Sequence, residues 1–123
     1  MYEITVEQHF EAAHFLRGYK GKCENVHGHQ YLVRVKIQTR QLNDIGLAYD
    51  FTDVKAALRS ITGRFDHVLL NDIHPFDKIN PSAENIARTV FEELQSKLAP
   101  GKAELTSVEA WENPQQGVSY RPD

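Results

Sequence analysis

The segment CENVHGH, residues 23–29, gathers side chains that can bind a metal ion or transfer a proton. It contains the only cysteine of the 123-residue chain and two of its six histidines. On an extended strand, residues two positions apart point to the same face, so the imidazoles of His27 and His29 can meet one ion. Cys23 is then either a further ligand or a reactive group beside the metal.

His14 is the candidate third ligand. If residues 2–14 and 29–39 pair as a hairpin, His14 lies beside His29. Three neutral imidazoles suit zinc, which they bind at about 2.0–2.1 Å, and they leave a fourth position open as catalytic sites do. Two other interpretations stay open: HGH is an ordinary turn, or Cys23 is the fourth ligand of a closed structural site.

Segments with the two-residue alternation of β-strands flank this motif on both sides. The first covers residues 2–14 and the second covers residues 29–39, with a loop rich in glycine and charge between them. Apolar side chains of the second segment share the face of His29, namely Tyr31, Val33, Val35 and Ile37. The alternation therefore predicts two strands that can bring His14 to HGH.

The spacing of apolar residues predicts a first helix over 50–61. Asp50 or Thr52 is available as its N-cap, since a short oxygen-bearing side chain there satisfies a free backbone N–H. Gly63 follows the last apolar position and is expected to end the helix.

A second helix is predicted over 81–98, opened by Pro81. The preceding segment, residues 65–81, is predicted to be loop with one short extended piece. Two strands, 104–112 and 118–121, are predicted after the second helix, joined by a turn rich in Pro, Asn and Gly.

The order strand, strand, helix, helix, strand, strand predicts an α+β fold. We expect one domain over residues 1–123, because this length suits a single core. Its predicted architecture is a four-stranded antiparallel sheet with two helices on one face.

Composition excludes several classes of partner. Hydrophobic residues make up 41% and charged residues 25% of the chain, as in ordinary globular domains. The formal net charge of −3 gives no positive excess for phosphate backbones, so no nucleic acid partner is expected. No apolar run approaches the roughly 18 residues of a membrane span. A single cysteine and a charged first segment indicate a cytoplasmic protein.

Several motifs together resemble one known family, the 6-pyruvoyltetrahydropterin synthase superfamily, over essentially the whole chain. These motifs are FEAAH ending at 14, CENVHGH, YDF at 49–51, FDH at 65–67, NPSAENIA at 80–87, WEN at 111–113 and YR at 120–121. Within the superfamily the chain most resembles the bacterial 6-carboxy-5,6,7,8-tetrahydropterin synthases of queuosine biosynthesis. Three residues separate Cys23 from HGH, as in that branch, whereas pyruvoyl-forming enzymes typically have five.

The resemblance implies that the ligands of a catalytic Zn²⁺ are His14, His27 and His29. It leaves Cys23 outside the metal shell as the base that removes a substrate proton. It also implies that Asp66 and His67 form a proton relay, which reaches Cys23 from a neighbouring subunit. Adjacent residues on a strand point to opposite faces, so Asp66 can orient His67 only if the backbone turns between them.

The resemblance implies that Glu112 anchors the pterin, because a carboxylate can accept two parallel hydrogen bonds from the ring. Asn113 follows it where Thr or Ser is commoner in the family. Ser82 and Glu84 fall in the helix-opening motif that lies near the pterin. Helix capping and the helix dipole explain both residues equally well.

The activity implied by the resemblance is that of a zinc-dependent carbon–carbon lyase. It would convert 7,8-dihydroneopterin triphosphate to 6-carboxy-5,6,7,8-tetrahydropterin, with release of acetaldehyde and triphosphate. Two alternatives are a 6-pyruvoyltetrahydropterin synthase and a non-catalytic, zinc-stabilised pterin-binding protein.

The implied assembly is a homohexamer, a dimer of trimers closed into a multi-chain barrel with active sites at subunit interfaces. Charge near the site loop is the only reason to consider four residues for the triphosphate, namely Arg17, Lys20, Lys22 and Arg64.

Overall fold

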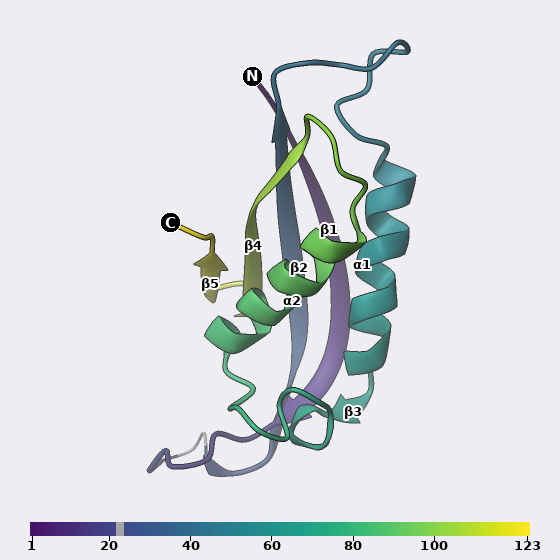
Figure 1. The fold of residues 1–123 in the computed structure, drawn as a ribbon. Helices are drawn as coiled ribbons and strands as arrows, with labels where there is room; N and C mark the ends of the chain where they lie inside the picture. The colour runs from purple at the N-terminus through teal and green to yellow at the C-terminus, as the bar shows by residue number, and fades with distance from the viewer. Residues whose placement is uncertain (22–23) are drawn as a thin grey trace.

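A long β-hairpin forms the centre of the fold (Figure 1). In this computed structural model, which describes residues 1–21 and 24–123, strand β1 (Tyr2–His14) pairs antiparallel with β2 (His27–Thr39). The predicted bounds of β1 are confirmed, whereas β2 begins two residues earlier than predicted. His14 therefore lies opposite His27, and Ala12 lies opposite His29. His29 is thus diagonal to His14 on the same face, not beside it as predicted.

The sheet has five strands in the order β3-β1-β2-β4-β5. Strand β4 (Glu104–Asn113) pairs with β2, and β5 (Gln116–Tyr120) pairs with β4, both antiparallel. The predicted α+β class is confirmed, but the four-stranded sheet was wrong by one strand. The fifth strand, β3 (Val68–Leu69), lies where one short extended piece was predicted within residues 65–81, and it pairs parallel with β1. Two residues are too few to show an alternating pattern, so the sequence did not predict that this piece joins the sheet.

Helix α1 (Phe51–Phe65) lies against the sheet, and its N-cap is Asp50, whose side chain accepts a hydrogen bond from the Thr52 N–H at 2.8 Å. The prediction that Gly63 ends the helix was wrong, because α1 continues to Phe65. Gly63 is exposed in the last turn, whereas Phe65 is buried in the core. Packing of this last turn outweighs the roughly 1 kcal/mol preference against glycine in a helix.

Helix α2 (Ala83–Lys97) lies on the same face of the sheet as α1 (Figure 1). Its N-cap is Ser82, whose hydroxyl accepts from the Asn85 N–H at 3.1 Å. Pro81 therefore precedes the helix and does not open it, so its carbonyl is available to other groups. No helix in the described parts of the chain is long and apolar enough to cross a membrane.

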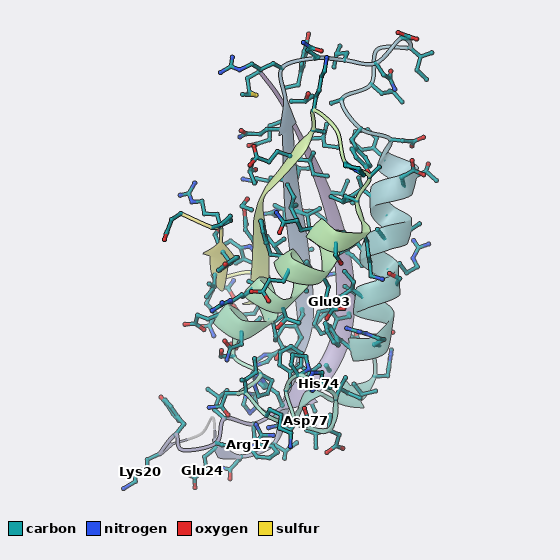
Figure 2. The ribbon with its side chains drawn as sticks, in the orientation of Figure 1. Arg17, Lys20, Glu24, His74, Asp77 and Glu93 are labelled. Carbon is teal, nitrogen blue, oxygen red and sulfur yellow. The ribbon has the colours of Figure 1, made fainter. Side chains whose placement is uncertain are left out.

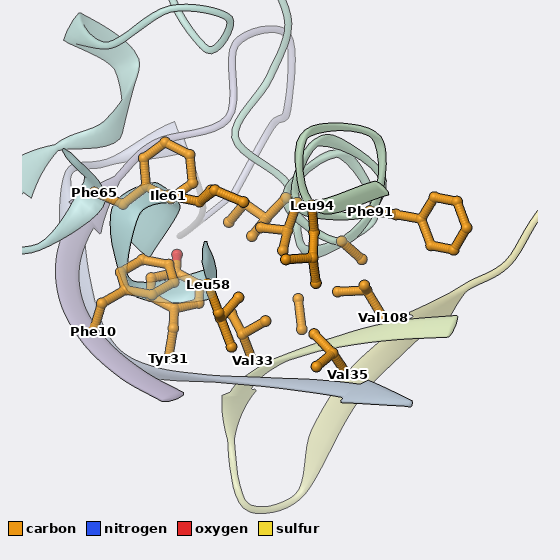
Figure 3. Packing of buried hydrophobic residues seen from close by; sticks show 14 of the residues in the cluster. Phe10, Tyr31, Val33, Val35, Leu58, Ile61, Phe65, Phe91, Leu94 and Val108 are labelled. Carbon is orange, nitrogen blue, oxygen red and sulfur yellow. The ribbon is translucent and has the colours of Figure 1, made fainter. Parts of the chain in front are cut away.

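The core fills the space between this face and the two helices (Figure 3). The ring of Tyr31 stacks on that of Phe10, with centroids 4.8 Å apart. Fully buried aliphatic side chains from the sheet and both helices complete the layer, among them Val33, Val35, Leu58, Ile61, Ile86 and Leu94. Each such burial stabilises the fold by about 1.5–3 kcal/mol. The same face of β1 and β2 ends in histidines, so the core supports them directly.

The connection between α1 and α2 folds back against the end of β1. The short 3-10 helix η2 (Leu70–Asp72) carries Asn71, whose amide bonds both the N–H and the carbonyl of Phe15 at 3.0 Å. The guanidinium of Arg17 donates to the Phe76 carbonyl at 2.9 Å. These bonds hold the start of α2 close to the histidine-bearing ends of the hairpin.

Candidate active site

Three histidines converge where the β1–β2 hairpin ends, and we call His14, His27 and His29 the three-histidine cluster. One ring nitrogen of each lies within 4.8 Å of the others. The ring centroids are 4.6 to 5.1 Å apart, and each pair of rings meets edge to face. The three rings therefore surround one point on the helix-facing side of the sheet.

Backbone carbonyls fix the orientation of two of these rings. The Nδ1 atom of His14 lies 2.7 Å from the Pro81 carbonyl oxygen, and that of His27 lies 2.7 Å from the Asn25 carbonyl oxygen. A carbonyl only accepts hydrogen bonds, so in each ring Nδ1 carries the proton and donates it. In the neutral rings Nε2 then presents a lone pair, which is the form that binds a metal ion.

The distance between the Nε2 atoms of His14 and His27 indicates that a cation can bind between them. The Nε2 atoms of His14 and His27 are 3.0 Å apart. Two lone pairs at this distance repel each other unless a cation or a proton lies between them. On a tetrahedral zinc ion with bonds of about 2.0–2.1 Å, two nitrogens are about 3.3–3.4 Å apart. The observed spacing is close to this value.

His29 adds an unpartnered nitrogen to the cluster. Its Nε2 is buried and has no hydrogen-bond partner within the described residues. Leaving such an atom unpaired is costly, and a bound metal ion would remove that cost. Burial lowers the pKa of His14 and that of His29 below the ordinary 6.5, and the neighbouring His27 lowers both further. The cluster therefore fits a metal ion, since burial favours the neutral, metal-binding form of His14 and His29.

Glu112 reaches the cluster from β4. Its Oε1 lies 4.0 Å from His14 Nε2 and its Oε2 lies 3.7 Å from His29 Nε2. Its Oε2 accepts a hydrogen bond from the Gln116 side chain at 2.9 Å. Glu109, on the same strand, points to the other face of the sheet and pairs there with Arg34 at 3.0 Å. Alternation along β4 thus separates the site glutamate from the structural one.

A hollow of about 190 Å³ lies beside Glu112, and we call it the Glu112 hollow. Glu84, in the first turn of α2, also lines it, together with Ala83, Gln116, Gly117 and Val118. Ser82 precedes this turn, and its hydroxyl is used as the N-cap. The structure therefore brings Glu112 and Glu84 to one hollow next to the three-histidine cluster.

Asp66 and His67, which we call the relay pair, follow α1 directly. The chain turns at His67, whose φ of 58° is unusual for a residue other than glycine. This turn lets adjacent side chains meet, with His67 Nδ1 2.9 Å from Asp66 Oδ2. The pKa of the Asp66 carboxyl is held below its ordinary 3.8, mainly by a hydrogen bond from the Glu11 N–H and secondly by one from the His67 ring.

The relay pair and the three-histidine cluster lie on different sides of the sheet. His67 meets the side chain of Glu11, which alternates with the buried Phe10 and Ala12 and so points away from the helices. In the described part of the chain, no hydrogen bond or ion pair joins His67 to the cluster. Cys23, the predicted base, lies outside the described residues, as does Lys22.

Two of the basic residues considered for a triphosphate have structural partners. The Arg17 side chain donates to backbone carbonyls of the α1–α2 connection, and Arg64 pairs with Glu93 at 2.9 Å. Lys20 is exposed and lies in the loop between β1 and β2 (Figure 2). Of these three, Lys20 alone makes no side-chain hydrogen bond or ion pair with the described residues.

Sequence reasoning missed the backbone partners of the site. The carbonyls of Pro81 and Asn25 orient two imidazoles, and backbone groups leave no signal in residue type. It also missed Glu11, which contacts His67 through pairing of distant segments, and Gln116, which contacts Glu112 across the turn between β4 and β5.

Fold and site together define a small α+β protein with a three-histidine cluster able to hold a metal ion beside an acidic hollow. The chain belongs to the 6-pyruvoyl tetrahydropterin synthase family, whose sequence model matches residues 3–123. It is 32% identical to the 6-carboxy-5,6,7,8-tetrahydropterin synthase of Bacillus subtilis, over 98% of this chain and 86% of that protein.

Other relatives agree with this assignment. The chain is 34% identical to the 6-carboxy-5,6,7,8-tetrahydropterin synthase of a Synechocystis species, over 98% of this chain and 93% of that one. Among solved structures, it resembles the 6-pyruvoyl tetrahydropterin synthase of Caenorhabditis elegans with a TM-score of 0.85 and 28% identity. That match covers 100% of this chain and 98% of the other. The family suggested by the sequence motifs is confirmed.

Proposed function

We propose that this protein is a zinc-dependent 6-carboxy-5,6,7,8-tetrahydropterin synthase that acts in queuosine biosynthesis. It would convert 7,8-dihydroneopterin triphosphate to 6-carboxy-5,6,7,8-tetrahydropterin, acetaldehyde and triphosphate. The observation that carries this proposal is the convergence of three imidazoles beside Glu112. The names of the bacterial relatives support the choice of product.

The three-histidine cluster would hold Zn²⁺ through Nε2 of each ring. When bound, the ion supplies a Lewis acid that stabilises negative charge developing on the substrate side chain. The protein contributes neutral ligands, which leave the charge of the ion undiminished. The Pro81 and Asn25 carbonyls keep two of the rings in the correct tautomer.

Glu112 would bind the pterin ring. A carboxylate accepts two parallel hydrogen bonds from the amino group and the adjacent ring N–H, as it does from a guanidinium. The Gln116 side chain holds one of its oxygens in place. Glu84 lines the same hollow and would contact the substrate there, with Ser82 setting the start of the helix that carries it.

Cys23 would remove the substrate proton as a thiolate, and the relay pair would take part in moving that proton. A thiol has a pKa near about 8.5, so it needs a nearby cation to be a thiolate at neutral pH. His67 and Asp66 lie on the far side of the sheet from the cluster of their own chain. This placement supports an active site shared between two chains.

The edges of the sheet support assembly of several chains. Strand β3 pairs with β1 at Ala12 and Ala13, and the Asp66–His67 segment bonds the backbone of Glu11, so residues 2–10 form an open edge within the described chain. Strand β5 is the opposite edge. Open edges of this kind pair readily with another strand. We expect a homohexamer, built as a dimer of trimers and closed into a multi-chain barrel.

The second candidate is a 6-pyruvoyltetrahydropterin synthase, which the likeness to the Caenorhabditis elegans structure favours. The deciding experiment is anaerobic turnover of 7,8-dihydroneopterin triphosphate by the zinc-loaded protein, with pterins separated by chromatography and acetaldehyde assayed in parallel. We expect 6-carboxytetrahydropterin with an equal amount of acetaldehyde. A pyruvoyl product without acetaldehyde would favour the second candidate. No turnover from the zinc-loaded oligomer would favour a non-catalytic pterin-binding protein.

A further inference from the structure

The imidazole of His67 lies between two carboxylates from different parts of the chain. On one side, Nδ1 is 2.9 Å from Asp66 Oδ2. On the other, Nε2 is 3.4 Å from Oε2 of Glu11, a residue of β1. The backbone of Glu11 contacts the same pair, since its N–H donates to Asp66 Oδ1 at 2.9 Å and its carbonyl accepts from the His67 N–H at 2.5 Å. Glu11 therefore meets the relay pair through its backbone and its side chain.

We propose that Glu11 is a positioning residue for His67, whose carboxylate holds the Nε2 end of the ring. The inference rests on the proposed function in one respect, the part of His67 in proton transfer. Nδ1 is occupied by Asp66, so Nε2 is the nitrogen that exchanges a proton with a group entering from outside. The residue that faces Nε2 thus controls the direction in which that nitrogen points.

The number of N–H groups on the His67 ring decides how many of the two carboxylates it can donate to. A neutral ring has one N–H and can donate to only one of the two carboxylates, whereas the protonated ring donates to both. With Glu11 in place, the neutral ring would leave one carboxylate against a lone pair. Both carboxylates therefore accept a hydrogen bond only from a ring with a proton on each nitrogen, and Glu11 is the acceptor for the one on Nε2.

The surroundings of His67 contain few other charges. Its ring borders a hollow of about 520 Å³, which we call the His67 hollow, on the side where β1, β2 and β3 meet. The titratable residues that line this hollow are Glu11 from β1, His29 from β2 and His67 itself. Asp66 is the remaining titratable partner of the ring. Among these groups, Glu11 is the carboxylate that faces Nε2.

Other glutamates on the same face of β1 have different partners. Glu7 pairs with Arg34 at 2.5 Å, and Glu3 accepts from the Gln38 side chain at 2.7 Å. Both lie on the same side of the strand as Glu11, because all three positions differ by multiples of two. Glu3 is therefore a matched control, with the same side chain, strand and face but without contact to the relay pair.

The test combines imidazole ¹⁵N spectra of His67 with steady-state kinetics on the full-length, zinc-loaded protein. The variants are Glu11→Ala, Glu11→Gln and Glu3→Ala. We expect the ¹⁵N signal of His67 Nε2 to move in both Glu11 variants, because the carboxylate facing that nitrogen is gone, and to stay unchanged in Glu3→Ala. Glu11→Gln keeps the shape of the side chain, so it still tests the loss of the carboxylate if Glu11→Ala disturbs the strand.

In the kinetics we expect kcat to fall by about tenfold in Glu11→Ala, with KM within about twofold, because the contact that positions His67 Nε2 is lost. Glu11→Gln, which retains an acceptor oxygen, should lose less. An unchanged His67 spectrum, an unchanged kcat, or an equal loss in Glu3→Ala would overturn the proposal. If the wild-type protein does not turn over the substrate, the proposed function fails, and the ¹⁵N spectra alone decide whether Glu11 positions His67.

Discussion

The three-histidine cluster and His67 have opposite environments. The three-histidine cluster lies on the helix-facing side of the sheet, where the His14 side chain is 1% exposed. His67 lies on the other side, 73% exposed and flanked by two carboxylates. Burial favours the neutral imidazoles of His14 and His29, which suits metal binding, whereas at His67 a carboxylate faces each ring nitrogen. One residue type thus acquires two chemistries from its position in one sheet.

Removing one histidine from each group should separate these chemistries. We expect His29→Ala to lose most of its zinc and its turnover, because two imidazoles bind the ion far more weakly than three. His67→Ala should keep zinc at the wild-type level while kcat falls by about 10²- to 10⁴-fold, the usual contribution of a proton-transfer group. Metal content by elemental analysis, measured with turnover on the same samples, checks both. Loss of zinc from His67→Ala would contradict the separation.

The two carboxylates of the Glu112 hollow should also differ in how strongly they affect KM. We expect Glu112→Gln to raise KM by about 10- to 100-fold with zinc retained, since it removes a charged hydrogen-bond acceptor for the pterin. Glu84→Gln, on the same hollow, should raise KM by less, because Glu84 is exposed at the helix terminus. Steady-state kinetics with metal analysis measures this difference. Equal effects of the two substitutions would contradict the special role of Glu112.

The pH dependence of stability should reflect the buried cluster. The pKa of His14 and that of His29 are lowered in the folded chain, so the unfolded chain binds protons more readily below the ordinary 6.5. Their neutral forms therefore support folding fully above about pH 6.5, and this support is lost as the pH falls through the folded values. Thermal unfolding of the metal-free protein across this range measures the effect. His67→Gln should show the same fall, since His67 is outside the cluster.

The smallest expected effect concerns Ser82. As the N-cap of α2, Ser82→Ala should destabilise the protein by about 1 kcal/mol. Asp50→Ala, which removes the N-cap of α1, is the matched control and should cost a similar amount. If capping is the main role of Ser82, both variants should keep KM within about twofold of wild type. A selective rise of KM in Ser82→Ala would assign it a direct contact with substrate.

Much of the fold was predictable because alternation and helical spacing report directly on burial. The bounds of β1 and the cap at Asp50 followed from side chains alone. The early start of β2 did not, since His27 and Gly28 carry no apolar signal and join the strand through backbone pairing with β1. Helix α1 passed Gly63 because packing of Phe65 decided its end.

The candidate site was likewise predictable where residue types carried the signal, and not where backbone conformation did. The HxH spacing suggested two ligands, and the hairpin suggested His14, from residue types alone. The turn that joins Asp66 to His67 depends on a backbone conformation, the positive φ of His67, that no residue type required. The contact of Glu11 with His67 depends on the placement of the chain after α1 against β1, which also bonds Glu11 to Asp66, 55 residues away. Long-range contacts of this kind are invisible to local patterns.

The central claim is that three histidines hold the metal ion and leave a position open for the substrate. The most direct test is the absorption spectrum of the cobalt-substituted protein, compared with that of Cys23→Ala. We expect one Co²⁺ per chain, the visible bands of a four-coordinate ion, and the same spectrum in Cys23→Ala. An intense thiolate-to-metal absorption that disappears in Cys23→Ala would mean that the cysteine is a ligand, and would contradict an open catalytic site.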